Sequence, residues 1–237
     1  MNTKIMKQTF QKSLLCLLAT AIVGIFTSCS DDDNAPKIPE NIITDLVTIA
    51  TIQEQGATFE FQKLEDSPTI SLVAPNIKFD SYLYKKGQRV LISYVPQGGE
   101  RYVNDIVTVY GIQPVHNASI IEAPIADYPD WDFAPISVFE LWRTGTFLNL
   151  YSLMEYNIDP RFKVIVDEET LSQEYPHIYL TYEITSTSNS SLKSFNASID
   201  LAPIWDLVTC RGIIVHLNNS KGDDTITLDK FQTIKPL

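Results

Sequence analysis

The chain has few residues that form cross-links. It contains three cysteines among 237 residues, and two of them, Cys16 and Cys29, lie within or beside an N-terminal apolar segment. Cys210 is therefore the only cysteine in the remainder of the sequence, and within that remainder it has no cysteine with which to form a disulfide. In the segment LVTCRGIIVHL it is interpreted as a small buried hydrophobic residue. We expect the fold to be held together by packing of its core.

Positive charge is also scarce. The formal net charge is −11, and the first 28 residues hold three lysines and no acidic residue, which leaves 15 basic and 29 acidic residues after them. Such a chain repels nucleic acid. The densest basic segment, YKKGQR at residues 84–89, is typical of an exposed turn. We therefore expect no nucleic-acid partner.

Sequence motifs of catalysis and cofactor binding are missing. The sequence contains no G-x-S-x-G, no H-E-x-x-H, no P-loop and no paired C-x-x-C. The three histidines, His116, His177 and His216, lie on separate predicted elements without the spacing of metal ligands. We expect no catalytic residue, no metal and no cofactor, and hence a protein that is not an enzyme.

The N-terminal apolar segment, residues 14–26, has the features of a secretory signal. Three lysines precede it, and it is shorter than the ~20 residues that span a bilayer. It leads into Phe26-Thr27-Ser28-Cys29, which resembles the bacterial lipobox. The resemblance implies removal of residues 1–28, lipidation of the Cys29 thiol and attachment to a membrane through acyl chains. The alternative is a transmembrane anchor, which the short segment and the lack of a following basic cluster disfavour.

An acidic stretch follows Cys29 directly and resembles the surface-export tag of Bacteroidetes lipoproteins. It also fits a solvated linker that an anionic membrane repels. We expect an outer-membrane lipoprotein, exposed at the cell surface, with an acidic tether over residues 29–40. The residues of the expected tag are Ser30, Asp31, Asp32 and Asp33.

The sequence after the tether is β-rich throughout, with Val, Ile, Thr, Tyr and Phe alternating with polar residues. Five short strands within residues 41–115 predict a small OB-like barrel, which removes exposed sheet edges. Glycine-containing turns separate several of these strands. The expected strands are 45–53, 57–64, 69–73, 89–95 and 105–112.

Four prolines interrupt this pattern, and residues 116–135 are predicted to form a linker and covering loop. Residues 136–237 then resume the alternation, with one apolar face and one polar face on each strand, which predicts an antiparallel, Ig-like β-sandwich. Residues 186–194, STSNSSLKS, are predicted to be a long loop. The expected strands are 136–142, 147–156, 162–166, 178–185, 195–201, 212–217 and 225–228.

Several of these segments resemble the NigD-like lipoproteins of Bacteroidetes. They are GQRVLISY (87–94), TGTFLNLYSLMEY (144–156) and FNASIDLAPI (195–204), followed by GIIVHLNNSKGDDTITL. The resemblance covers the chain after Glu40 and implies an N-terminal OB-like domain followed by a C-terminal β-sandwich. The family takes its name from a member encoded beside a bacteriocin, so the resemblance also implies a bacteriocin-associated role. No functional residue of the family maps onto this chain.

The segment ADYPDWDF, residues 126–133, is the strongest candidate for a binding site. Its acids alternate with aromatic rings, and sugars are bound by flat apolar rings together with hydrogen-bond acceptors. Two carboxylates are also what a glycosidase uses as acid and base. The alternative is structural, because a proline-rich loop often buries its aromatic residues between domains. The candidate glycan or partner contacts are Tyr128, Asp130, Trp131 and Asp132.

Three functions are compatible with these observations. We expect a non-enzymatic binding module, anchored to the membrane through the lipid on Cys29, that takes an unknown protein or peptide of the cell envelope as its partner. The second hypothesis is a glycan-binding surface lipoprotein that uses Tyr128 and Trp131. The third is a hydrolase of sugar or peptide, in which Asp130 takes part.

Overall fold

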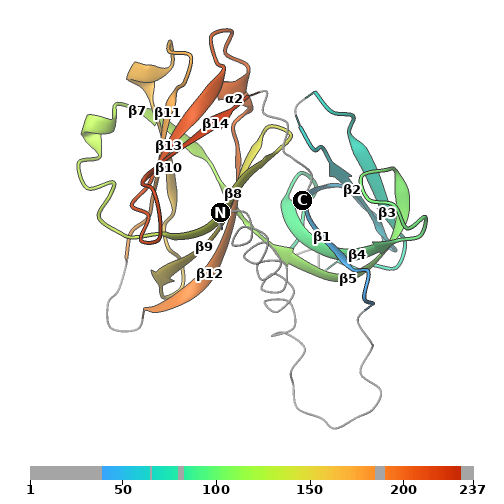
Figure 1. Ribbon diagram of the computed structural model, residues 1–237. Coiled ribbons are helices and arrows are strands. Elements are labelled where there is room, and N and C mark those ends of the chain that lie inside the picture. Colours follow the sequence, from blue (N-terminus) through green and yellow to red (C-terminus); the bar gives the residue numbers. More distant parts are fainter. Residues whose placement is uncertain (1–38, 65, 80–82, 185–189, 231–237) are drawn as a thin grey trace, which may run out of the picture. The chain divides into compact units, whose positions relative to one another are not determined.

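The computed structural model describes residues 39–64, 66–79, 83–184 and 190–230 (Figure 1). The predicted signal peptide, Cys29 and the acidic tag lie outside the described residues. The chain divides into two units, Met1–Ile42 and Ile43–Leu237, and the strands described below belong to the second. None of the helices within the described ranges has the length and apolar character needed to cross a membrane.

The first five strands form a closed barrel in the order β1-β2-β3-β5-β4 (Figure 1). Alternate residues point inward, so Val47, Ile49, Phe59 and Ile92 are completely buried. All neighbouring strands are antiparallel except β3 and β5, which are parallel. The expected OB-like barrel is confirmed. Its strands are β1 (Ile43–Ile52), β2 (Ala57–Phe61), β3 (Ile70–Ala74), β4 (Arg89–Pro96) and β5 (Asp105–Pro114).

The remaining strands form the two sheets of a sandwich. The five-stranded sheet has the order β14-β13-β11-β10-β7, and the four-stranded sheet has the order β6-β12-β9-β8. The strands of the first are β7 (Ile120–Ala123), β10 (Lys163–Asp167), β11 (His177–Thr181), β13 (Gly212–His216) and β14 (Thr225–Asp229). The strands of the second are β6 (His116–Ala118), β8 (Ser137–Thr144), β9 (Phe147–Tyr156) and β12 (Ser191–Asp200).

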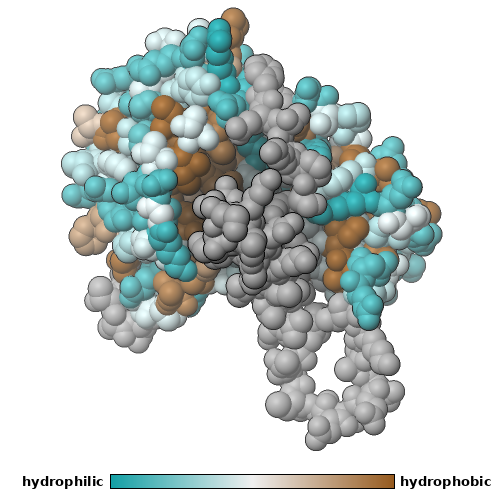
Figure 2. Space-filling view, viewed as in Figure 1, coloured by the Kyte–Doolittle hydropathy of each residue, from teal (hydrophilic) through white to brown (hydrophobic). Residues whose placement is uncertain are grey.

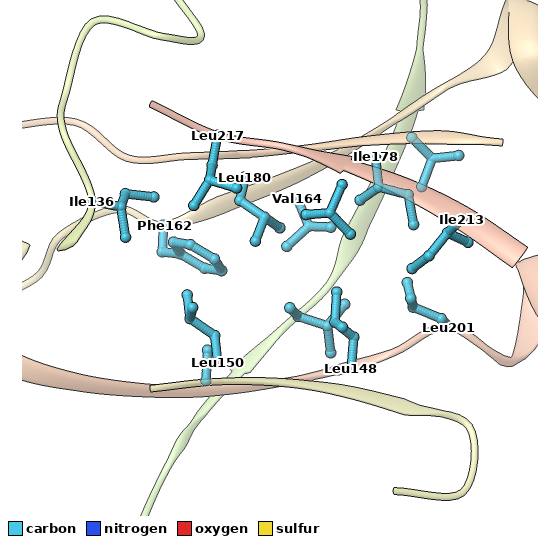
Figure 3. Packing of buried hydrophobic residues seen from close by; sticks show 14 of the residues in the cluster. Ile136, Leu148, Leu150, Phe162, Val164, Ile178, Leu180, Leu201, Ile213 and Leu217 are labelled. Carbon is cyan, nitrogen blue, oxygen red and sulfur yellow. The ribbon is translucent and has the colours of Figure 1, made fainter. Parts of the chain in front are cut away.

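The core of the sandwich lies between the inner faces of these sheets. Figure 3 shows Leu148 and Leu150 of β9 facing Val164, Leu180 and other apolar residues of the opposite sheet. The alternation read from the sequence predicts this arrangement correctly, since the apolar residues that it places on the inner faces of β11 and β12 all belong to the buried cluster. These residues are Ile178, Leu180, Phe195, Ala197 and Ile199.

Two features of the sandwich differ from the expectation. Residues 116–123, assigned to the linker, form β6 and β7, which pair in parallel with β12 and β10. The β11–β13 pairing is also parallel, so the sheets are mixed and not wholly antiparallel. Strands of three and four residues are too short to show a reliable alternation, and parallel pairing joins segments distant in sequence. β12 also begins at Ser191, inside the segment predicted to be a loop.

Three short helices complete the described elements: η1 (Ile125–Asp127), η2 (Glu168–Thr170) and α2 (Ala202–Trp205). η2 is capped by Asp167, whose side chain accepts a hydrogen bond from the Glu169 N–H. α2 places Trp205 in the core, where the indole is completely buried and the Arg143 guanidinium lies 3.8 Å from its ring centroid. These helices lie in the connections between strands, and η2 and α2 each contribute buried residues.

Candidate functional site

The candidate contact residues lie directly after η1, on the loop that leads to β8. The Trp131 N–H donates to the Tyr128 carbonyl at 3.1 Å, and the Phe133 N–H donates to the Asp130 carbonyl at 3.1 Å. These bonds form successive turns. Tyr128 and Trp131 are half-buried, whereas Asp130 and Asp132 are exposed. Neither of these carboxylates accepts a hydrogen bond from the described part of the chain.

Trp131 packs on the outer face of the five-stranded sheet. Its ring contacts Tyr179 of β11 edge-on, with a centroid distance of 4.8 Å and an angle of 73°. Tyr179 points outward because its neighbours Ile178 and Leu180 point into the core. Trp131 therefore anchors its loop on the five-stranded sheet of the sandwich, which we call the staple interpretation. The structural alternative drawn from the sequence placed these aromatic residues between two domains, and this contact lies within one. Sugar binding by this segment stays a prediction.

The same face carries two histidines in direct contact. His216 Nε2 lies 3.2 Å from His177 Nδ1, and the two ring centroids are 4.9 Å apart. The Tyr179 ring stacks on His216 at 4.5 Å and 14°. Burial lowers the pKa of His216, and the neighbouring His177 lowers it further. We call Trp131, His177, Tyr179 and His216 the aromatic–histidine cluster.

The sequence did not indicate this pair, because the two histidines are 39 residues apart. They meet because β11 and β13 pair in parallel, with Tyr179 opposite His216 and His177 opposite Ile214. A parallel register of this kind leaves no local signal in the sequence. In the described ranges, no group of three or more His, Cys, Asp or Glu side chains is arranged to hold a metal ion.

A second candidate site lies on the barrel, where most of the exposed large hydrophobic side chains of the described chain are found. Val73 of β3 and Ile106 of β5 are register partners and are 42% and 44% exposed. Val103, which precedes β5, and Tyr110, which lies on β5, are exposed to a similar extent. We call these four residues the β3–β5 surface. Figure 2 shows hydrophobic residues exposed among hydrophilic ones on the barrel.

The pairing between β3 and β5 is short. It consists of Leu72 with Asp105 and Val73 with Ile106. Beyond it, the side chain of Asn76 takes the place of a strand: its amide donates to the Val109 carbonyl at 3.2 Å and accepts from the Val109 N–H at 3.3 Å. A side-chain amide thus satisfies the β5 main chain next to the exposed apolar residues.

Tyr102 lies at the rim of the barrel, in the loop before β5, and has an unusual backbone. Its φ of 67° is rare for an aromatic residue. The ring stacks on Phe61 at 5.3 Å, and the guanidinium of Arg101 lies 4.6 Å from its centroid. Arg101 also forms an ion pair with the buried Asp45 at 2.6 Å. Burial raises the pKa of Asp45 even though Arg101 opposes this. These contacts hold the loop that carries Val103 against the barrel.

No protein-family model matches the sequence, and no curated protein matches it. Solved structures do match. A protein of unknown function from Bacteroides vulgatus has a TM-score of 0.60 and 16% identity, over 83% of this chain and 92% of that chain. A NigD-like immunity protein from Bacteroides caccae has a TM-score of 0.52 and 14% identity, over 82% and 95%. A protein assigned as a lipoprotein from Bacteroides fragilis has a TM-score of 0.53 and 13% identity, over 83% and 100%.

At these identities the similarity concerns the fold. The chain has the fold of the NigD-like immunity protein, and the resemblance indicated by the sequence is confirmed at that level. The matches extend over nearly the whole length of the other chains, so barrel and sandwich occur together in them.

Proposed function

We propose that this chain, which shares its fold with a NigD-like immunity protein and with a Bacteroides lipoprotein, is a lipid-anchored binding module of the outer membrane. In this proposal it binds a protein partner without catalysing a reaction. The lipobox around Cys29 supports the anchor, and the following acidic residues support display at the cell surface. The β3–β5 surface is the binding site.

The exposure of apolar side chains on adjacent strands is the observation that carries this proposal. Val73, Ile106 and Tyr110 are each at least 40% exposed. Single exposed apolar residues are common, but Val73 and Ile106 are partners across the β3–β5 pair and together form an apolar area. Such areas mark sites where a protein docks.

The β5 main chain indicates the kind of partner. Val109 pairs with Tyr94 of β4 on one side, and on the other side its main chain is met by the Asn76 amide and not by a strand. An extended segment of another protein can replace that amide and add to β5. In an added strand, every second side chain would contact Ile106 and Tyr110. We therefore propose that the partner presents an extended segment with alternating apolar residues.

Cross-linking in intact cells tests the interaction. The full chain carries a tag at its C-terminus, and proteins cross-linked to it are identified after purification. The proposal expects one specific envelope protein, recovered with the lipidated chain and lost with Cys29→Ser, which removes the anchor. Metabolic labelling with a palmitate analogue checks the anchor itself, and Cys210→Ser is the matched control that keeps the label. Recovery of the same proteins with Cys29→Ser contradicts the proposal.

Glycan binding at Trp131 is the second candidate function. It is favoured by the position of this half-buried ring between the exposed Asp130 and Asp132. Retention of envelope polysaccharide by the purified chain, lost in Trp131→Ala with the fold intact, supports it. Turnover of that polysaccharide, abolished by Asp130→Asn, would instead support a hydrolase.

The name of the similar NigD-like immunity protein suggests one setting for the interaction, in which the partner belongs to a bacteriocin system. A strain that lacks this chain then has altered tolerance to, or production of, a bacteriocin. Unchanged tolerance and production in that strain would remove this version of the proposal.

A further inference from the structure

The contact between His177 and His216 provides two metal ligands on the outer face of the sandwich. We propose that these residues bind one divalent first-row transition-metal ion, with His216 Nε2 and His177 Nδ1 as ligands and the remaining positions open to water. This site is separate from the β3–β5 surface. It does not depend on the proposed binding function.

The distance between the two nitrogens fits such a site. They lie 3.2 Å apart. Metal–imidazole bonds of about 2.0–2.1 Å place two adjacent ligands roughly 2.8–3.0 Å apart in a square-planar ion and roughly 3.3–3.4 Å apart in a tetrahedral ion. The ion can therefore replace the proton between the rings with small movements of the side chains. In a neutral His177 ring the loss of the Nδ1 proton is balanced by protonation of Nε2, so both ligands stay neutral imidazoles.

The surroundings orient His216 for this role. Tyr179 stacks on its ring, and Thr225 Oγ1 lies 3.5 Å from its Nδ1. With the Nδ1 proton directed at the Thr225 hydroxyl, Nε2 keeps its lone pair for a metal. Metal-binding histidines usually donate their second N–H in this way.

A nearby carboxylate also attracts a cation. Asp167 is 6% exposed and lies close enough for its negative charge to act on His216. Its Oδ1 accepts hydrogen bonds from the Ile125 and Glu169 N–H groups, so its position is fixed by the ends of η1 and η2. Asp167 is not a ligand in this proposal.

Two imidazole ligands with open positions favour ions in the order of the Irving–Williams series, so Cu²⁺ binds more tightly than Ni²⁺. Calcium and magnesium ions do not suit this site because they prefer oxygen ligands. The expected ion is therefore Cu²⁺ or Zn²⁺.

Titration of the full chain in detergent with CuCl₂ and ZnCl₂ tests the site, using a tag without histidine. We expect one ion per chain, and at least tenfold weaker binding in both His177→Gln and His216→Gln. His116→Gln is the matched control and should bind like the wild type. The ring centroids of Trp131 and His216 are 6.3 Å apart, so bound Cu²⁺ should quench the fluorescence of Trp131. The variant Trp131→Phe should remove this part of the quenching signal.

Electron paramagnetic resonance of the wild type with one Cu²⁺ gives a result that does not depend on the folding of any variant. Two coordinated imidazole nitrogens are expected. A spectrum with fewer than two nitrogens, the absence of binding, or unchanged affinity in His177→Gln and His216→Gln would overturn the proposal.

Discussion

Arg89 of β4 donates a hydrogen bond from Nε to the Ser198 hydroxyl of β12 at 3.1 Å, which links the barrel to the sandwich. Arg89 is only 3% exposed, and its Nη2 donates to Thr144 Oγ1 at 2.8 Å. Its guanidinium lies 4.3 Å from the centroid of the Phe147 ring. Burial lowers the pKa of Arg89 to about 9. The groups that contact this charge include hydroxyls and an aromatic ring, and the carboxylates of Asp200 and Asp45 oppose the effect of burial on its pKa.

We predict that Arg89→Met destabilises the chain by about 2 kcal/mol, because the donors to Ser198 and Thr144 are lost inside the joint. Urea unfolding followed by circular dichroism measures the change. Arg211→Met is the control, since the pair of Arg211 with Glu174 is exposed and contributes at most about 1 kcal/mol. Equal stability of the two variants would contradict this account of the joint.

Trp131→Ala should lower the free energy of unfolding by about 2 kcal/mol, because the contact of the indole with Tyr179 is lost. Trp131→Phe should recover part of this loss. Phe133→Ala, in the same loop, serves as the control because Phe133 is 76% exposed. If thermal melting shows no loss in Trp131→Ala, the staple interpretation fails.

Gly212 of β13 has no room for a side chain. A Cβ at this position would lie 2.5 Å from the Tyr175 ring and 2.6 Å from the Leu228 carbonyl oxygen. Gly212→Ala should therefore cost about 2 kcal/mol through displacement of β14 or Tyr175. In Gly222→Ala the new Cβ meets only the Asn219 side chain, so unfolding in urea should be nearly unchanged.

The stability of the chain should fall in acid partly because of His116. Its ring packs between Phe162 and Phe195, and burial lowers its pKa below the ordinary 6.5. As the pH falls through about 6.5, the unfolded chain binds a proton that folded His116 resists, so the free energy of unfolding decreases. The decrease levels off below the folded pKa.

Unfolding in urea at pH 7.5, 6 and 5 measures this effect. His116→Gln should show a shallower decrease over this range than the wild type, because the group that titrates is missing. A decrease of equal or greater slope in the variant would contradict the assignment to His116.

The sequence predicted the barrel and the sandwich because their long strands alternate clearly. The residues of β12 that point inward, Phe195, Ala197 and Ile199, all belong to the core, as their spacing indicates. The short strands β6 and β7 were missed, since each is bounded by a proline or a brief break and shows no alternation.

The sites were harder to predict than the fold. The segment around Trp131 was identified from its composition, but its packing on Tyr179 depends on how the loop folds over the sheet. The His177–His216 contact and the Val73–Ile106 pair both arise from parallel pairing between distant segments. Neither has a local sequence signal, so only the three-dimensional structure shows them.

We propose above all that the β3–β5 surface binds an extended segment of a protein partner. The most direct test compares Ile106→Lys with Leu192→Lys in the cell-based cross-linking experiment. Leu192 is the matched control because it is an apolar residue of β12, 61% exposed, outside that surface. We predict that Ile106→Lys lowers recovery of the partner at least tenfold, whereas Leu192→Lys leaves it unchanged. Equal recovery with both folded variants would contradict the claim.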